Sequence, residues 1–169
     1  GQHPQALAAL NKAQEHYQAA LRMARSDPAY FHGAAKLYLN QLSLELYIGK
    51  SPISTHEHLI QISQELQQLQ PDSVDSRSVR LTAALIMIRY HSDRREPFEH
   101  VESQAMTDLA YVRRFPMSPT MTQLQAVLYA SLAEAGLNRG LPLGDLPGLA
   151  EAAAKQAASS PEHPSLGYQ

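Results

Sequence analysis

Hydrophobic residues along this chain recur at steps of three and four residues, the spacing that places side chains on one face of an α-helix. Near the start, Leu7, Leu10 and Leu21 follow this rhythm, while polar residues occupy most positions between them. Each such segment is expected to be an amphipathic helix that buries one stripe of side chains. The segments with this pattern are 4–25, 54–70 and 97–115.

Three other segments carry apolar residues around most of the helix circumference, so each is expected to have neighbours on two sides. They are residues 28–48, 73–91 and 119–135. The run Leu81–Ile88 also fits a buried strand, but it continues a polar start with a helix cap, and no second strand exists to pair with it. A shorter alanine-rich helix at 146–158 would cap the C-terminal end. The pattern therefore predicts an all-α fold of about seven helices.

Short polar residues and glycines mark where these helices are expected to begin and end. Asp27 and Ser118 each precede a proline, an arrangement that suits a helix N-cap followed by the first helical residue. Ser54 and Glu57 are spaced as a capping box, which predicts a helix start at Ser54. Gly49 and Gly136 stand where the left-handed conformation that ends many helices is expected.

Prolines punctuate the chain at intervals of about 44 residues, each of them after an amphipathic helix. They are Pro28, Pro71, Pro116 and Pro161. Each interval contains an apolar helix, a short loop and an amphipathic helix, so the chain divides into hairpin units preceded by a single helix. The units are residues 28–71, 72–116 and 117–161. This period predicts antiparallel hairpins stacked within one domain, residues 1–158, followed by a flexible tail at 159–169.

Helix pairs in series, each closed by a proline, resemble the tetratricopeptide (TPR) family over roughly residues 4–160. Small residues at Ala83, Ala84 and Ala126 suit its close helix packing, although the unit is longer than the family's repeat of about 34 residues. The resemblance implies a short right-handed solenoid whose first helices line a concave, protein-binding face. Long, irregular arrays of this kind often form the C-terminal region of bacterial signalling proteins such as serine/threonine kinases. Other helical-hairpin solenoids fit the same pattern.

Composition and charge narrow the classes of function. The 169 residues carry a net charge of −2, which lacks the basic excess of a dedicated nucleic-acid binder. No cysteine is present, so a disulfide framework, a cysteine-ligated zinc site and a cysteine nucleophile are excluded. No run of about 18 apolar residues occurs, so we expect no membrane insertion in this segment. The sequence does not indicate a compartment.

Residues that carry catalysis or hold a cofactor do not form any recognisable motif. The G-x-S-x-G pattern of a nucleophile elbow is missing. His56 and His58 lie two positions apart, about 200° around a helix, whereas a metal needs its ligands on one face. We therefore expect no enzyme, no cofactor and no metal site. A helical enzyme would need a buried cluster of titratable groups in one cleft.

Polar residues of the first helices are the natural partner contacts if those helices line a concave face. Lys36, Asn40 and Ser43 are spaced at i, i+4 and i+7 and therefore form one stripe. Arg77 and Arg80 would meet an acidic peptide or a C-terminal carboxylate, because the arginine fork offers a carboxylate two parallel hydrogen bonds. The candidate contacts are Lys36, Asn40, Ser43, Arg77, Arg80 and Gln123. The alternative is that these residues are only the solvent-facing sides of their helices.

The predicted function is that of an interaction module or scaffold that binds a peptide or partner protein on this face. The alternative is a ligand-sensing or regulatory segment of a larger bacterial signalling protein, with a small molecule bound between helices. The N-terminal end begins in the middle of a unit and shows no cap. We therefore expect that end to dock onto an upstream region or onto a second copy of the chain.

Overall fold

The computed structural model describes residues 3–24 and 26–159, and this part of the chain consists of seven α-helices without any strand. The all-α prediction is therefore confirmed. The helices are α1 (His3–Met23), α2 (Pro28–Tyr47), α3 (Ile53–Leu69), α4 (Asp75–Arg94), α5 (Glu99–Val112), α6 (Pro119–Asn138) and α7 (Leu146–Ala158). None of these helices is long and apolar enough to cross a lipid bilayer. Apart from Ser159, the tail predicted at 159–169 lies outside the described residues.

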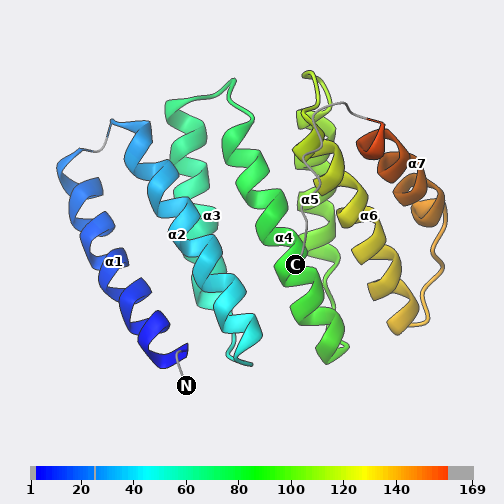
Figure 1. The fold of residues 1–169 in the computed structure, drawn as a ribbon, viewed down its shortest axis with the longest axis horizontal. Helices are drawn as coiled ribbons and strands as arrows, with labels where there is room; N and C mark the ends of the chain where they lie inside the picture. The colour runs from blue at the N-terminus through cyan, green and yellow to red at the C-terminus, as the bar shows by residue number, and fades with distance from the viewer. Residues whose placement is uncertain (1–2, 25, 160–169) are drawn as a thin grey trace.

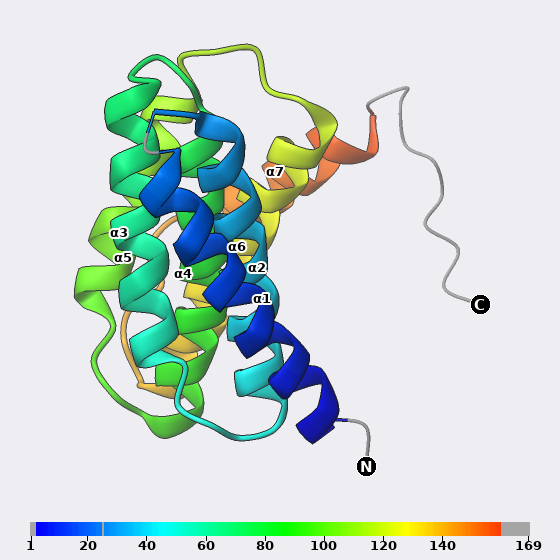
Figure 2. The same ribbon diagram turned by 90° about the vertical axis from the view of Figure 1, so that its left-hand side faces the viewer.

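The helices are arranged as a row in which helices that follow one another along the chain pack together, except α5 and α6 (Figure 1). α2, α4 and α6 lie side by side, and α4, in the middle, contacts both of the others. α3 packs against α2 and α4, and α5 packs against α4, so these two helices cover one side of the row (Figure 2). α1 lies against α2 at one end of the row, and α7 packs against α6 at the other end.

Buried positions recur between α3 and α5 with a constant shift of 46 residues. The buried pairs are Thr55 and Val101, Leu59 and Ala105, Ile62 and Asp108, Ser63 and Leu109, and Leu66 and Val112. The same shift relates buried residues of α2 to those of α4, for example Tyr38 to Ala84. The two hairpins α2–α3 and α4–α5 therefore bury the same faces of their helices.

Hydrogen bonds at the helix starts confirm two of the predicted N-caps. The Asp27 side chain accepts from the backbone N–H two residues further on at 2.9 Å, and that of Ser118 from the third at 3.2 Å. Gly49 follows α2 with a φ of 74°, as predicted. The capping box at Ser54 is wrong, because α3 begins at Ile53 and no side chain caps its first turn.

The predicted end of α6 at Gly136 is also wrong. The helix continues through this residue to Asn138, and Gly140 adopts the positive φ, 69°, instead. A Cβ at Gly136 would lie 3.1 Å from Cδ2 of Leu143. Glycine therefore serves here to let the loop after α6 pack closely against the helix.

Candidate binding surfaces

The exposed sides of α2, α4 and α6 form a face with two adjoining hollows, which we call the first-helix face. The larger hollow has a volume of about 510 Å³. It is lined by Ser43, Leu46 and Tyr47 of α2, by Leu85, Ile86, Arg89 and Asp93 of α4, and by Val127 and Ser131 of α6. The second hollow, of about 350 Å³, shares Arg89, Asp93 and Ser131 with the first. A binding partner would therefore contact three helices that are distant in sequence.

Apolar side chains are open to solvent on this face. Tyr47 is 75% exposed and Val127 is 46% exposed. Between them on α4, the exposed side chains of Arg89 and Asp93 stand one helical turn apart and bring opposite charges. The first-helix face thus combines an apolar contact area with charges of both signs, from Arg89 and Asp93 and, in the second hollow, from Glu134.

Four of the six predicted contact residues lie on or beside this face. Ser43 lines the larger hollow, and Lys36 and Asn40 continue its exposed stripe along α2. Gln123 is exposed on α6, one turn before Val127. Their role in binding a partner stays a prediction.

Arg77 and Arg80 instead point between α3, α4 and α5, where they share one buried carboxylate. Arg80 pairs with Asp108 in a bidentate manner, with Nε at 2.7 Å from Oδ2 and Nη2 at 2.6 Å from Oδ1. Nη1 of Arg77 donates to the same Oδ1 at 2.9 Å, and Nη1 of Arg80 donates to Oε1 of Gln67 at 3.0 Å. Asp108 is 0% exposed and Arg80 is 7% exposed. The cluster therefore joins three helices internally and is not part of the first-helix face.

The sequence-based prediction placed these arginines on the wrong side of α4 because it used an incorrect residue shift between the α2–α3 and α4–α5 hairpins. The interval of about 44 residues between the prolines pairs Lys36 with Arg80, which lies two residues short of the shift that relates the buried positions. Two residues correspond to about 200° around a helix, so the error exchanges the buried and exposed sides. With the shift of the buried positions, Ser43 corresponds to Arg89 and Asn40 to Ile86. Applying the shift of the buried positions to Ser43 would therefore have identified Arg89 as a candidate contact residue.

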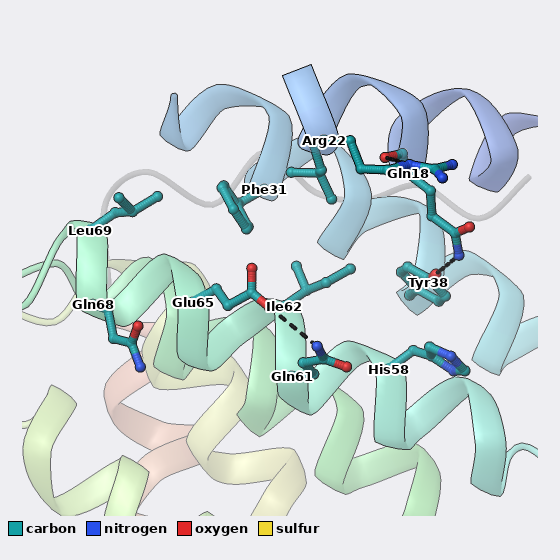
Figure 3. A pocket seen from close by; sticks show the side chains of 11 residues that line it. Gln18, Arg22, Phe31, Tyr38, His58, Gln61, Ile62, Glu65, Gln68 and Leu69 are labelled. Atoms are coloured by element: carbon teal, nitrogen blue, oxygen red, sulfur yellow. Dashed lines mark hydrogen bonds between the residues drawn. The ribbon is translucent and has the colours of Figure 1, made fainter. Parts of the chain in front are cut away.

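A hollow of about 860 Å³, which we call the α1–α3 groove, lies between α1 and α3 with α2 as its floor (Figure 3). Its apolar lining is Leu21, Phe31, Tyr38, Ile62 and Leu69, and its polar lining is Gln18, Arg22, His58, Gln61, Glu65 and Gln68. The amide of Gln18 donates to the Tyr38 hydroxyl at 3.3 Å, and that of Gln61 donates to Glu65 at 3.3 Å. The groove therefore has an apolar floor and a rim of hydrogen-bonding groups.

A further hollow, of about 490 Å³, lies where the start of α1 meets the end of α2. Its lining includes Leu7, Ala8 and Ile48. The predicted docking of the N-terminal end onto another chain stays a prediction, and this hollow is the place that a docked side chain would fill.

Three histidines from different helices come together beside the loop between α4 and α5. The ring centres of His91 and His100 are 5.9 Å apart, and Nδ1 of His91 lies 3.0 Å from Oε2 of Glu96. Burial, together with the two neighbouring imidazoles, lowers the pKa of His56 from 6.5 to about 4. His58 points away from this group and lines the α1–α3 groove. Within residues 3–24 and 26–159, no three potential ligands are placed to hold a metal ion.

Comparisons of the chain with models of known protein families, with curated proteins and with solved structures give no match. The resemblance to TPR arrays therefore depends on the sequence pattern alone. The same holds for the link to the C-terminal regions of bacterial signalling proteins. Function has to be inferred from the surfaces themselves.

Proposed function

We propose that this chain is a protein-interaction module whose first-helix face binds a segment of a partner protein. The observation that carries the proposal is the exposure of Tyr47 and Val127 around the hollow where α2, α4 and α6 meet. Apolar side chains that gather around a hollow, with polar groups beside them, are typical of surfaces that contact another protein.

The charges on the face indicate what kind of segment would fit. Arg89 lines the hollow together with Ile86 and Val127, and its guanidinium is able to hold a carboxylate through two hydrogen bonds. Lys36 adds positive charge on α2, while Asp93 favours a base at the other end of the segment. The proposed partner segment therefore places an apolar side chain in the hollow, next to an aspartate, a glutamate or a C-terminal carboxylate.

The architecture that we propose for the module is a short right-handed solenoid of three helix hairpins, similar to TPR arrays. The constant shift between the buried positions of α3 and α5 supports the repeat. The contacts of α4 with α2 and with α6 also support it, because first helices of successive hairpins are neighbours in such a stack. In this proposal α6 and α7 form the third hairpin, and α1 stands in the place of a preceding second helix.

Selection of random displayed peptides against the intact chain tests the binding proposal. We expect the enriched peptides to carry an apolar residue next to an acidic one. Arg89→Glu should then weaken their binding about tenfold or more, since it replaces attraction by repulsion. Val127→Asp should weaken binding similarly, whereas Ala110→Asp, a matched change at an exposed position of α5, should leave the affinity unchanged.

Thermal unfolding of the same variants separates a loss of binding from a loss of structure. Arg89 and Val127 are exposed, so both variants should melt close to the parent chain. Peptides that bind both variants as tightly as the parent would contradict the assignment of this face.

The second candidate function is small-molecule sensing, and the size of the α1–α3 groove favours it. Its volume of about 860 Å³ falls in the range of pockets that hold drug-sized ligands. Native mass spectrometry of the purified chain should then show a retained compound that is lost on unfolding. A mass equal to that of the bare chain, with no shift in melting across a metabolite panel, would count against sensing.

A further inference from the structure

The α1–α3 groove is related to a filled region of the next hairpin by the same 46-residue shift that relates the buried positions. In the α4–α5 hairpin, the space between α3 and α5 is occupied by the arginine–aspartate cluster. The corresponding pairs are Leu21 and Gln67, Phe31 and Arg77, Ala34 and Arg80, Ile62 and Asp108, and Glu65 and Tyr111. The groove and the cluster thus occupy equivalent positions in two successive hairpins.

Side chains of the chain itself fill this place in the second hairpin. The guanidinium of Arg77 lies 3.8 Å from the centre of the Tyr111 ring, and Arg77 and Arg80 both bind Asp108. The Tyr111 hydroxyl donates to the backbone carbonyl of Pro71 at 3.3 Å, which ties α5 to the end of the preceding hairpin. Two arginine stems, a carboxylate and a ring together close the space between α3 and α5.

The first hairpin lacks the long side chains that would close the equivalent space. Ala34, fully buried, stands in place of Arg80, and Ile62 stands in place of Asp108. What remains is an open groove with an apolar floor, on which Phe31 and Ile62 face each other from α2 and α3 (Figure 3). This floor is suited to the aliphatic stem or the ring of an incoming side chain.

The groove also provides a carboxylate near its apolar floor. Glu65 lines it from α3, one turn after Gln61, and extends toward Phe31 (Figure 3). On the α1 side, Nε of Arg22 donates to the backbone carbonyl of Gln18 at 3.2 Å, which holds this base at the rim. A cation inside the groove would therefore meet the carboxylate of Glu65.

We propose that the α1–α3 groove binds a polypeptide segment of a partner in which an apolar residue lies next to an arginine or lysine. The apolar residue covers Phe31 and Ile62, and the basic group pairs with Glu65. The segment thereby provides an aliphatic stem and a cation from another chain. In the second hairpin, Arg77 and Arg80 provide these groups from within the fold. The side-chain amides of Gln61 and Gln68 at the rim accept hydrogen bonds from the N–H groups of the segment's backbone and donate hydrogen bonds to its carbonyl groups.

This site is separate from the first-helix face, and a segment bound here would take the place of the small molecule that is the second candidate under Proposed function. The first-helix face lies on α2, α4 and α6 and favours an acidic segment, whereas the groove lies between α1 and α3 and favours a basic one. Failure of one site therefore leaves the other unaffected, and Arg89→Glu serves as a control for the groove.

Peptide selection with subtraction tests the proposal on the intact chain. Random displayed peptides are selected on the parent chain and depleted on the Glu65→Arg variant. We expect the surviving peptides to carry arginine or lysine beside an apolar residue. By fluorescence anisotropy, Glu65→Arg should weaken a representative peptide about tenfold or more, and Glu65→Gln should weaken it less. Glu57→Arg, the same change at an exposed site on α3, and Arg89→Glu should not affect it.

A charge exchange completes the test. Replacing the basic residue of the peptide by glutamate should restore binding to Glu65→Arg. The proposal is overturned if no peptide survives subtraction, if the survivors are acidic, or if a small molecule retained by the chain blocks the groove to every peptide. If Glu65→Arg lowers the melting temperature, Glu65→Gln provides the same comparison with a side chain of equal size.

Discussion

At Asp108 the chain buries a carboxylate completely and surrounds it with two arginines from the neighbouring helix. Removing ions from water costs several kcal/mol each, and this cost is offset only when geometry and hydrogen bonding are good. Here the bidentate pair with Arg80, the bond from Arg77 and the acceptance by Gln67 offset much of this cost, although Nε of Arg77 is buried and has no partner among the described residues. The cluster therefore specifies how α3, α4 and α5 meet.

Asp108→Ala should lower the free energy of unfolding by about 3–5 kcal/mol, because it leaves Arg77 and Arg80 without their carboxylate in a buried place. Replacing the whole cluster with apolar residues of similar volume, as in Arg77→Met, Arg80→Met and Asp108→Leu together, should cost much less. Urea unfolding followed by circular dichroism measures both. A triple variant that is less stable than Asp108→Ala would refute this account.

The burial of His56 makes stability depend on pH. The pKa of His56 is about 4 in the folded chain and 6.5 when unfolded, so between these values the unfolded state binds more protons. The stability that depends on neutral His56 is therefore fully present above pH 6.5, and this contribution is lost as the pH falls toward 4. The loss is at most about 3–4 kcal/mol, since one pKa unit corresponds to about 1.4 kcal/mol. The imidazoles of His91 and His100 lie close to that of His56, and Glu96 contacts His91.

The His56→Gln variant should lose part of this pH dependence, because glutamine does not titrate in that range. Urea midpoints measured across the window check the slope. His16→Gln, at an exposed position of α1, should keep the slope of the parent chain. Equal slopes in the parent chain and in His56→Gln would show that His56 does not carry the effect.

Exposed contact residues were predictable from the sequence only as far as the register was correct. Lys36, Asn40 and Ser43 stand on the exposed stripe of α2 because the spacing within one helix is fixed by its geometry. Arg77 and Arg80 were misplaced because a buried arginine, such as Arg80 at 7% exposure, is not distinguished from a surface residue until its carboxylate, distant in sequence, is known. Asp108 itself gave no signal, since a lone aspartate in an amphipathic helix is ordinarily exposed.

Among the described helices, α1 is the one without a buried residue. Its contacts with α2 include Tyr17, which packs over Gly33, and hydrogen bonds from Gln14 and Gln18. A Cβ at Gly33 would lie 2.5 Å from the Tyr17 ring. Glycine inside a helix costs about 1 kcal/mol relative to alanine, so its use here indicates that close contact with α1 matters.

Gly33→Ala should therefore displace Tyr17 and loosen α1 while favouring the helical state of α2. Hydrogen exchange measured by mass spectrometry should show faster exchange in residues 3–23 and unchanged protection in α4 and α6. Gly148→Ala in α7, where an added Cβ meets nothing within 4 Å, is the matched control and should leave exchange in α1 unchanged. Unchanged exchange in α1 of Gly33→Ala would show that the Tyr17 contact does not hold the helix.

Helix existence followed from the sequence more reliably than helix ends. All seven helices lie where hydrophobic periodicity predicts them, because a buried stripe requires that spacing whatever the neighbours are. The ends predicted at Ser54 and Gly136 differ from those in the structure. At Gly136, the approach of Leu143 after the helix gives the glycine a packing role that local sequence does not reveal.

Across the described helices, most contacts join neighbours along the chain, and the others join α2 to α4 and α4 to α6. α4 is the centre of this network, since it touches α2, α3, α5 and α6, whereas α7 packs against α6. Proline spacing predicted such neighbour-to-neighbour packing, but it could not fix the register between hairpins. That register becomes visible only when the buried positions of two hairpins are compared, so it cannot be read from any single helix.

Contacts between neighbours predict that the chain tolerates a cut between hairpins better than a cut within one. A chain ending at Pro116 keeps α1 to α5 with the Asp108 cluster intact, and it should fold with a lower melting temperature. A chain ending at Glu96 retains α4 but leaves Arg77 and Arg80 without Asp108, so α4 should lose its exchange protection. Similar protection of α4 in both truncated chains would mean that the α4–α5 contact does not hold α4. Loss of all protection in both would mean that the whole chain folds as one unit, and the proposal of stacked hairpins would then fail.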